Sequence, residues 1–145
     1  DVAEQVQDMV SLGLMTSEQA TAIDAEGLWS FLQSALGRRM AAARVLRREW
    51  PFTLRIPASE AAPGAPADRG LLVQGVMDAC FIEEDAWVLI DYKTDRVIEK
   101  SLAEAAQKHA PQLEMYARAL ETLTGKPVKE QYVVLLRKHT AVQLD

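Results

Sequence analysis

The sequence predicts an α/β protein in which helices flank a mixed central sheet. The first forty residues have the apolar spacing of helices. Two apolar runs follow at residues 71–82 and 86–93, with the acidic segment EEDA as the reversal between them. Two further helical patterns then precede EQYVVLLRK, a continuous apolar run typical of a central strand. Strands that alternate with helices in this way indicate a sheet covered by helices.

The N-terminal helical region contains its own start and stop signals. Thr16 or Ser17 can cap a helix because a hydroxyl oxygen accepts a free backbone N–H of the first turn. In the segment LWSFLQSALG, one helical face carries Leu28, Phe31, Leu32 and Leu36. Gly37 is expected to end this helix. We interpret Trp29 as a core or partner-facing aromatic rather than a platform for base stacking.

A half-buried strand is predicted for RVLRREWPFTLRI. Its apolar residues occupy every second position, except that Arg48 takes one of these positions. They are Leu46, Trp50, Phe52, Leu54 and Ile56. Pro51 cannot donate a hydrogen bond to a neighbouring strand, so the strand should lie at an edge or contain a bulge. The following segment PASEAAPGAPADRG is rich in Ala, Pro and Gly, which predicts a mobile loop.

The second half of the chain has equally clear boundaries. Ser101 and Glu104 form a capping-box pattern at the start of SLAEAAQ. Pro111 fits the first turn of the next helix, and Gly125 fits its end. AVQLD is predicted to be a short last strand.

Composition limits the possible classes of protein. A chain of 145 residues with 49% hydrophobic and 26% charged residues is expected to form a single globular domain, residues 1–145. It lacks an apolar run of ~18 residues and a signal-peptide pattern, so we expect no membrane association. Cys80 is the single cysteine, which excludes an intramolecular disulfide and thiolate-rich metal sites. We therefore expect a reducing, cytoplasmic setting.

The charges are unevenly distributed. The net charge of −5 argues against a domain that holds nucleic acid through bulk electrostatics. However, a short segment concentrates five arginines, Arg38, Arg39, Arg44, Arg47 and Arg48. A solvated helix end and strand edge would explain this cluster, and so would a patch that contacts phosphates. The sequence leaves both readings open.

The predicted hairpin places two acids opposite each other. If the reversal is centred between Glu84 and Asp85, opposite residues can be counted outward from it. The resulting pairs are Ile82–Trp87, Cys80–Leu89 and Asp78–Asp91. Direct cross-strand partners have Cβ atoms about 4.5–5.5 Å apart. Lys93 lies two residues after Asp91 and therefore projects from the same face.

Two carboxylates at that separation in apolar surroundings repel each other unless one is protonated or a cation lies between them. Mg²⁺ suits oxygen ligands and accepts sites with one or two carboxylates plus water and phosphate. A neighbouring lysine can orient the attacking water and stabilise negative charge at phosphorus. The combination predicts a site for phosphodiester hydrolysis. On these residues alone, Lys93 could equally be a simple salt-bridge partner of Asp78 or Asp91.

Several motifs together carry a family resemblance. GVMDACF, VLIDYKTDR and PQLEMYARAL occur in this order, and REWPF precedes them. The set resembles PD-(D/E)xK nucleases of the RecB type, and most closely the C-terminal nuclease domain of the A subunit of AddAB-type bacterial helicase–nucleases. The resemblance covers the chain from about Gln5 to its end. It implies a restriction-endonuclease-like fold and a nuclease that depends on Mg²⁺, with Mn²⁺ as a possible substitute.

The resemblance also implies roles for individual residues. Asp78 and Asp91 would be metal ligands, Lys93 the catalytic lysine, and Tyr92 a ligand through its backbone carbonyl. The supporting residues would be Glu49, Gln112 and Tyr116. Gln112 and Tyr116 share a helical face at i, i+4 spacing, although such a pair is more often a capped surface pair. For Glu49, a salt bridge with Arg47, Arg48 or Lys93 is a comparable alternative to holding the metal through water.

Two features depart from the family pattern. The family's upstream histidine, in a G-x-x-x-H pattern, is not found, and His109 and His139 are interpreted as surface or structural residues. We therefore expect the chain, which begins at Asp1, to be a fragment that lacks the histidine helix. The lone cysteine also predicts that the iron–sulfur cluster of some relatives is missing.

By resemblance, the module would cut single-stranded DNA that a helicase motor supplies, during the processing of double-strand breaks for recombination. Its partners would be DNA, the helicase motor domains of the same parent chain and the B subunit of the heterodimer. The alternative is a catalytically silent docking domain of the same fold that binds a partner subunit.

Overall fold

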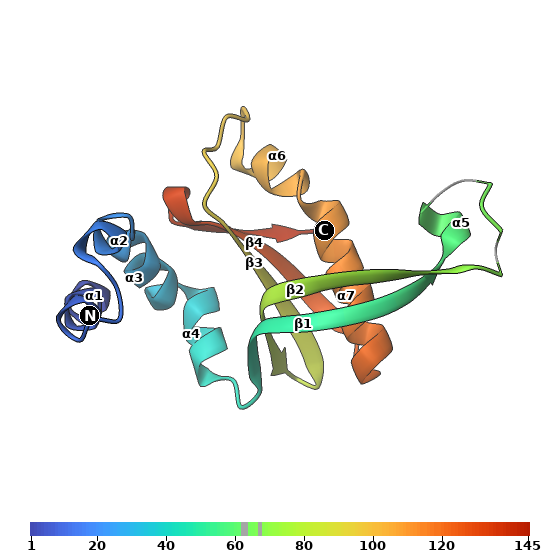
Figure 1. Cartoon of the computed structure of the whole chain (residues 1–145), viewed down its shortest axis with the longest axis horizontal. Helices are drawn as coiled ribbons and strands as arrows, with labels where there is room; N and C mark the ends of the chain where they lie inside the picture. Colours follow the sequence, from blue (N-terminus) through green and yellow to red (C-terminus); the bar gives the residue numbers. More distant parts are fainter. Residues whose placement is uncertain (62–63, 67) are drawn as a thin grey trace.

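In the computed structural model, which describes residues 1–61, 64–66 and 68–145, a five-stranded mixed sheet forms the centre of the molecule (Figure 1). Its strands, in spatial as well as chain order, are β1 (Leu46–Pro57), β2 (Gly70–Glu83), β3 (Ala86–Lys93), β4 (Val128–Leu135) and β5 (Thr140–Leu144). Neighbouring strands are antiparallel, except that β3 and β4 are parallel. The predicted α/β class with a mixed sheet is confirmed.

The N-terminal region forms four helices, α1 (Val2–Ser11), α2 (Ser17–Thr21), α3 (Ala25–Gln33) and α4 (Ala35–Ala42). Thr16 caps α2 as predicted, because its hydroxyl oxygen accepts the Gln19 N–H at 3.1 Å. The prediction that one helix ends at Gly37 is wrong. The chain breaks instead at Ser34, whose hydroxyl oxygen caps α4 by accepting the Gly37 N–H at 3.0 Å.

Gly37 has a different role from the one predicted. A Cβ at this position would lie 2.1 Å from the Phe31 carbonyl oxygen, so only glycine allows α4 to begin directly against the end of α3. The predicted apolar face of this region is also only partly buried. Phe31 and Leu36 are in the core, whereas Leu32 and Trp29 are exposed.

The connection from β3 to β4 contains α6 (Leu102–Gln107) and α7 (Ala110–Thr124). Ser101 caps α6 by accepting the Glu104 N–H at 3.1 Å. Gly125 ends α7 with φ 70°, a left-handed conformation that glycine adopts without steric cost. A 3₁₀ turn, η1 (Leu136–Lys138), joins β4 to β5. The predicted boundaries in this half of the chain are therefore confirmed.

The segment that was predicted to be a mobile loop contains one short helix, α5 (Ala58–Ala61). Residues 62, 63 and 67 of this segment lie outside the described residues. On either side of it, β1 and β2 pair as a long two-stranded ribbon that extends away from the rest of the sheet (Figure 1). Strand β1 is an edge strand, as Pro51 predicted.

The sheet has a hydrophobic core on each face. On one face α6 and α7 pack against the strands, with Phe52, Met77, Leu89, Leu113, Leu120 and Val133 among the buried residues. On the opposite face α3 and α4 pack through Phe31, Leu36 and Met40 onto Ala79, Phe81, Val88 and Ile90. These two layers hold the central strands rigidly, because each interior position fills space between packed elements.

In β1 and its partner β2, side chains no longer alternate regularly between the two faces of the sheet at one position in each strand. On β2, Met77 and Cys80 both belong to the core under α7, although residues three apart in a regular strand point to opposite faces. On β1, Trp50 packs against this same core, whereas Leu46 packs against the other one. The register with β2 is the same on both sides of the break, at Arg48–Ala79 and at Trp50–Met77. The break therefore lies at Glu49 and Asp78.

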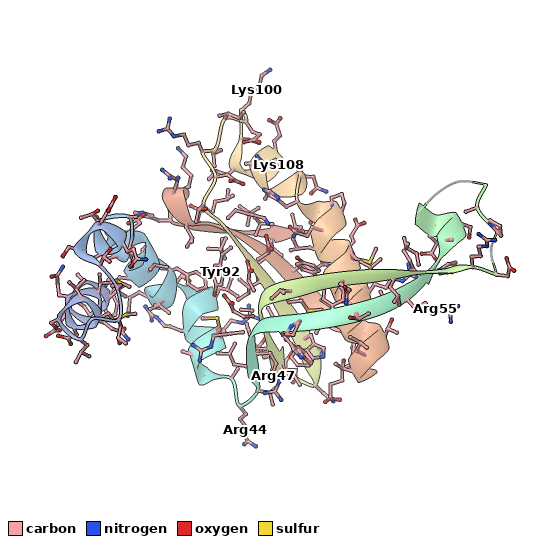
Figure 2. The ribbon with its side chains drawn as sticks, in the orientation of Figure 1. Arg44, Arg47, Arg55, Tyr92, Lys100 and Lys108 are labelled. Carbon is pink, nitrogen blue, oxygen red and sulfur yellow. The ribbon has the colours of Figure 1, made fainter. Side chains whose placement is uncertain are left out.

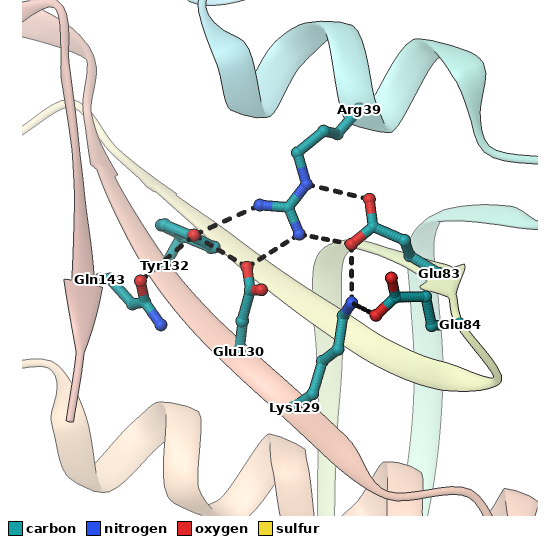
Figure 3. Close-up of polar contacts among 7 residues, drawn as sticks. All are labelled: Arg39, Glu83, Glu84, Lys129, Glu130, Tyr132 and Gln143. Carbon is teal, nitrogen blue, oxygen red and sulfur yellow. Dashed lines mark hydrogen bonds and ion pairs between the residues drawn. The ribbon is translucent and has the colours of Figure 1, made fainter.

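A polar network ties α4 to β2 and β4 (Figure 3). The Arg39 guanidinium donates to Glu83 at 2.7 and 3.0 Å and to Glu130 at 2.9 Å. Lys129 Nζ lies 2.7 Å from a Glu83 carboxylate oxygen on the same side. Arg39 therefore joins α4 to the end of the β2–β3 hairpin and to β4.

In the part of the chain that the structure describes, no helix has the length and apolar character needed to cross a membrane.

Candidate active site

The β2–β3 hairpin has the predicted register over five residue pairs. These pairs run from Glu83–Ala86 to Ala79–Ile90 and include Ile82–Trp87 and Cys80–Leu89. Glu84 and Asp85 have φ values of 52° and 64°, which matches a tight two-residue hairpin turn. The ladder stops one step before the predicted Asp78–Asp91 pair.

In place of a backbone pairing with Asp91, Asp78 is joined to β3 by a hydrogen bond to its side chain. Its Oδ2 accepts the backbone N–H of Tyr92 at 2.8 Å. The carboxylate is thus fixed to β3 beside Asp91, although the two residues are not paired in the ladder. Burial raises the pKa of the Asp91 carboxyl, and the Asp78 charge adds to this increase.

Asp91 is the buried acid of this site, with 2% of its surface exposed. Burial raises the pKa of its carboxyl, and the neighbouring Lys93 ammonium opposes this effect. Lys93 Nζ lies 2.8 Å from Asp91 Oδ2. The contact is an ion pair without hydrogen-bond geometry, since Oδ2 is buried and has no hydrogen-bond partner among the described residues. Asp91 Oδ2 therefore already lies beside one cation, which a buried carboxylate requires.

Lys93 also connects the acids to α7. Its Nζ donates to Gln112 Oε1 at 2.8 Å, and Gln112 Nε2 donates to the Tyr116 hydroxyl at 2.8 Å. The Tyr116 ring packs edge-on against Phe52, with ring centroids 5.5 Å apart. Gln112 and Tyr116, which the sequence placed on one helical face, therefore form a chain of hydrogen bonds that ends at Lys93.

Glu49 lies opposite Asp78 and has φ 50°, a left-handed conformation that is uncommon for a residue with a side chain. Its side chain makes no ion pair with Arg47, Arg48 or Lys93 within the described ranges, so this alternative is not found. Together with Arg48, Asp78 and Tyr92, Glu49 lines an open pocket of about 370 Å³.

His109 lies within electrostatic range of Lys93 and Asp91, which the sequence interpretation did not predict. His109 precedes α7, and its buried Nε2 has no hydrogen-bond partner among the described residues. Burial lowers the pKa of its imidazole, Lys93 lowers it further, and Asp91 opposes this. The signal was available in the spacing, since His109, Gln112 and Tyr116 lie at i, i+3 and i+7. His139 is a surface residue as predicted, with Nε2 3.2 Å from Asp24 Oδ2.

The donor set fits a hard divalent cation. Asp78 and Asp91 supply carboxylate oxygens, and Asp91 Oδ2 is a buried acceptor without a hydrogen bond among the described residues. Mg²⁺ is commonly held by one or two carboxylates and keeps several waters, so two acids are sufficient. Within the described residues, no three His, Cys, Asp or Glu side chains are grouped closely enough to enclose a metal. The role of the Tyr92 carbonyl stays a prediction.

The chain is similar to known proteins over nearly its whole length. Residues 1–143 match the family model described as the PD-(D/E)XK nuclease superfamily. The chain is 43% identical over 143 residues to the A subunit of the ATP-dependent helicase/nuclease of Desulforudis audaxviator, covering 97% of this chain and 12% of that protein. It is 42% identical over 139 residues to the protein of the same name from Acetivibrio thermocellus, covering 93% of this chain and 11% of that protein.

The match to known structures concerns the fold alone. The crystal structure of SSO0001 superposes with a TM-score of 0.50 at 14% identity, covering 99% of this chain and 61% of that one. The mixed five-stranded sheet with flanking helices is consistent with the restriction-endonuclease-like fold that the motifs predicted. The family match over nearly the whole chain, together with the identity to the two helicase/nuclease proteins, shows that this chain belongs to the PD-(D/E)XK nuclease superfamily.

Proposed function

We propose that this chain is the nuclease module from the A subunit of a helicase–nuclease, and that it hydrolyses single-stranded DNA in a metal-dependent reaction. The observation that carries the proposal is the grouping of Asp78, Asp91 and Lys93, in which a second carboxylate and an ammonium lie beside the buried Asp91.

Asp78 and Asp91 would hold Mg²⁺ or Mn²⁺, with the Tyr92 carbonyl as a further ligand and Glu49 acting through water. When bound, the ion would neutralise charge on a phosphoryl oxygen and lower the pKa of a bound water. The carboxylates are fixed before binding, because Asp78 is bonded to the Tyr92 N–H and Asp91 is enclosed by packed strands. Such a rigid arrangement favours catalysis because it needs little reorganisation.

Lys93 would orient the attacking water and stabilise negative charge at phosphorus. Its ammonium is held between Asp91 Oδ2 and Gln112 Oε1, each at 2.8 Å. Only 18% of its side-chain surface is exposed, so the solvent screens its charge less than at the surface. Tyr116 would act through Gln112 by fixing the amide that accepts from Lys93.

The proposal extends to the parent protein. The chain spans 11–12% of the length of the curated relatives described above, and their name combines helicase and nuclease activities. We propose that motor domains of the same parent chain supply the single strand, that a B subunit completes the enzyme, and that it processes double-strand breaks for recombinational repair. Because bacterial chromosomal DNA lies in the cytoplasm, this compartment is part of the proposal. The net charge of −5 is compatible with a module that cuts DNA held by other domains.

The test is cleavage of a labelled single-stranded oligonucleotide with Mg²⁺ or Mn²⁺ and with EDTA. We compare the parent with Asp78→Ala and Lys93→Ala, and with Asp8→Ala and Lys100→Ala as matched exposed controls. The two site variants should lose roughly 100-fold or more in rate, because each removes a group that acts on developing charge. The controls should cleave like the parent. Equal cleavage by all five proteins would show that a contaminant is responsible.

The alternative of a catalytically silent docking domain makes a different prediction in the same assay. No protein of the set would cleave, and a longer chain that includes an upstream histidine helix would not restore activity. Restoration by the longer chain would instead support the expectation that a third protein ligand lies outside these residues.

A further inference from the structure

The left-handed Glu49 changes which side chains can reach the Asp78 pocket. Successive residues of a regular strand point to opposite faces, so Arg48 and Glu49 would normally lie on different sides of the sheet. Here φ is 50° at Glu49, and both residues line the same open pocket with Asp78 and Tyr92. Backbone strain of this kind persists only where the surrounding structure imposes it, and it is common at functional sites.

The arginine cluster noted in the sequence divides into two groups. Arg39 forms ion pairs with Glu83 and Glu130, and Arg38 donates a hydrogen bond to the Gln33 carbonyl at 2.9 Å. By contrast, Arg44, Arg47 and Arg48 are exposed and form no ion pair with any residue that the structure describes. The first group therefore has a structural role, whereas the second keeps its charge available.

Only one member of the second group reaches the pocket. Arg44 lies at the α4–β1 connection and points away from the fold, with Arg47 close by (Figure 2). The Arg47 guanidinium lies over the Trp50 ring, 5.9 Å from its centroid. Arg48 lines the pocket beside Asp78.

An arginine that lies among carboxylates without bonding to them is well placed to bind an external anion. Its planar guanidinium matches two oxygens of a phosphate, and it stays charged at all physiological pH values. Phosphates of a nucleic acid backbone occur beside the scissile bond in every sequence, so this contact would position the strand without reading bases.

We propose that Arg48 forms a phosphate-binding subsite of the Asp78 pocket, which holds the backbone of single-stranded DNA beside the metal ligands. The inference rests on the proposed nuclease function and assigns Arg48 as a residue that positions the substrate. It separates Arg48 from the rest of the arginine cluster, and Arg44→Ala therefore provides a matched control.

The experiment measures binding without hydrolysis. The probe is a fluorescein-labelled oligothymidylate, titrated in EDTA by anisotropy at several KCl concentrations, against the parent, Arg48→Ala, Arg48→Lys and Arg44→Ala. Because one released phosphate contact lowers the salt slope of single-strand binding by about 0.7, Arg48→Ala should show this change together with an affinity loss of roughly tenfold. Arg48→Lys should keep the slope and lose part of the affinity, because it retains charge but not the planar fork.

Arg44→Ala should stay within about twofold of the parent in affinity, because an exposed charge outside the pocket contributes little. The thermal melting temperature of Arg48→Ala should equal that of the parent, which excludes unfolding as the cause. The proposal is overturned if Arg48→Ala and Arg44→Ala lose equal affinity, if the salt slope is unchanged, or if the parent does not bind the probe. Binding through Arg48 without Mg²⁺-dependent cleavage, either by the parent or by a longer chain that includes the upstream histidine helix, would contradict the nuclease function and leave the subsite supported.

Discussion

Replacing Arg39 by methionine tests whether the polar network holds α4 against the sheet. Methionine keeps much of the apolar stem of arginine and removes the guanidinium. The substitution deletes four hydrogen bonds, two to Glu83 and one to Glu130 at 2.7–3.0 Å and one to the Tyr132 hydroxyl at 3.4 Å (Figure 3). It leaves Glu83 with Lys129 as its remaining cation in the network. Helix α4 also carries Met40, whose sulfur accepts from the Tyr92 hydroxyl at 3.5 Å, so the network supports the strand that bears the site.

The magnitude follows from the pKa of Glu83. Its hydrogen bonds to Arg39, and then to Lys129, lower this pKa from 4.5 to about 2. At about 1.4 kcal/mol per pKa unit, the decrease corresponds to about 3 kcal/mol before screening. The side chains of Arg39 and Glu83 are 30% and 32% exposed, so solvent screens part of this energy. With Lys129 retained, we expect Arg39→Met to cost about 1–2 kcal/mol at pH 7.

The pH dependence has a definite sign. A carboxyl whose folded pKa is depressed contributes stability that is fully present above its unfolded pKa and is lost as the pH falls towards its folded pKa. For Glu83 the window lies between pH 4.5 and about 2. The difference in unfolding free energy between parent and variant should therefore be constant near neutral pH and should shrink below pH 4.5.

Urea unfolding followed by circular dichroism gives this difference. With an m value of about 2 kcal/mol/M, the midpoint should decrease by about 0.5–1 M. Arg38→Met is the control, because Arg38 is exposed and donates to the Gln33 carbonyl rather than to a carboxylate. Equal losses in the two variants, or a difference that persists undiminished at pH 3.5, would refute the assignment.

Three further outcomes are expected. Tyr116→Phe keeps the ring packed on Phe52 but removes the hydroxyl that accepts from Gln112. The cleavage rate should therefore fall by less than about tenfold, and the unfolding free energy measured in urea should change by about 1 kcal/mol or less. Gly75→Ala should lower the unfolding free energy by about 1–3 kcal/mol, because a Cβ would lie 2.7 Å from the buried Phe52 ring. Asp91→Asn should raise the melting temperature in EDTA, since burial already raises the pKa of this carboxyl. Mg²⁺ should stabilise the parent and should fail to stabilise this variant. Stabilisation of the variant by Mg²⁺ would contradict the role of Asp91 as a ligand.

Much of the fold follows from short-range patterns. The hairpin register could be counted from Glu84 and Asp85, because a two-residue turn fixes which residues face each other. The end of α7 at Gly125 was equally predictable, since the left-handed conformation there favours glycine. The predicted helix end at Gly37 was wrong, however. Ser34 and Gly37 are both residue types that occur at helix ends, and only packing against Phe31 decides between them.

The candidate site was predictable to a similar extent. Asp78, Asp91 and Lys93 stand out because charged residues interrupt apolar strands, and the Gln112–Tyr116 spacing is a local helical property. Their hydrogen-bond chain was not predictable, since Lys93 and Gln112 belong to elements that meet only when α7 packs on the sheet. The electrostatic interaction of His109 with Asp91 has the same origin.

The sequence by itself determined the order of helices and strands, the hairpin turn and the residue types of the site, because these depend on neighbours a few positions away. Tertiary structure alone decided that Asp78 bonds to the Tyr92 N–H and that the strand faces reverse at Glu49. It also decided that Arg39 is bound within the fold while Arg48 faces the Asp78 pocket. The physical reason is that a side chain's partner depends on which elements pack around it, and residues far apart in the chain supply those elements.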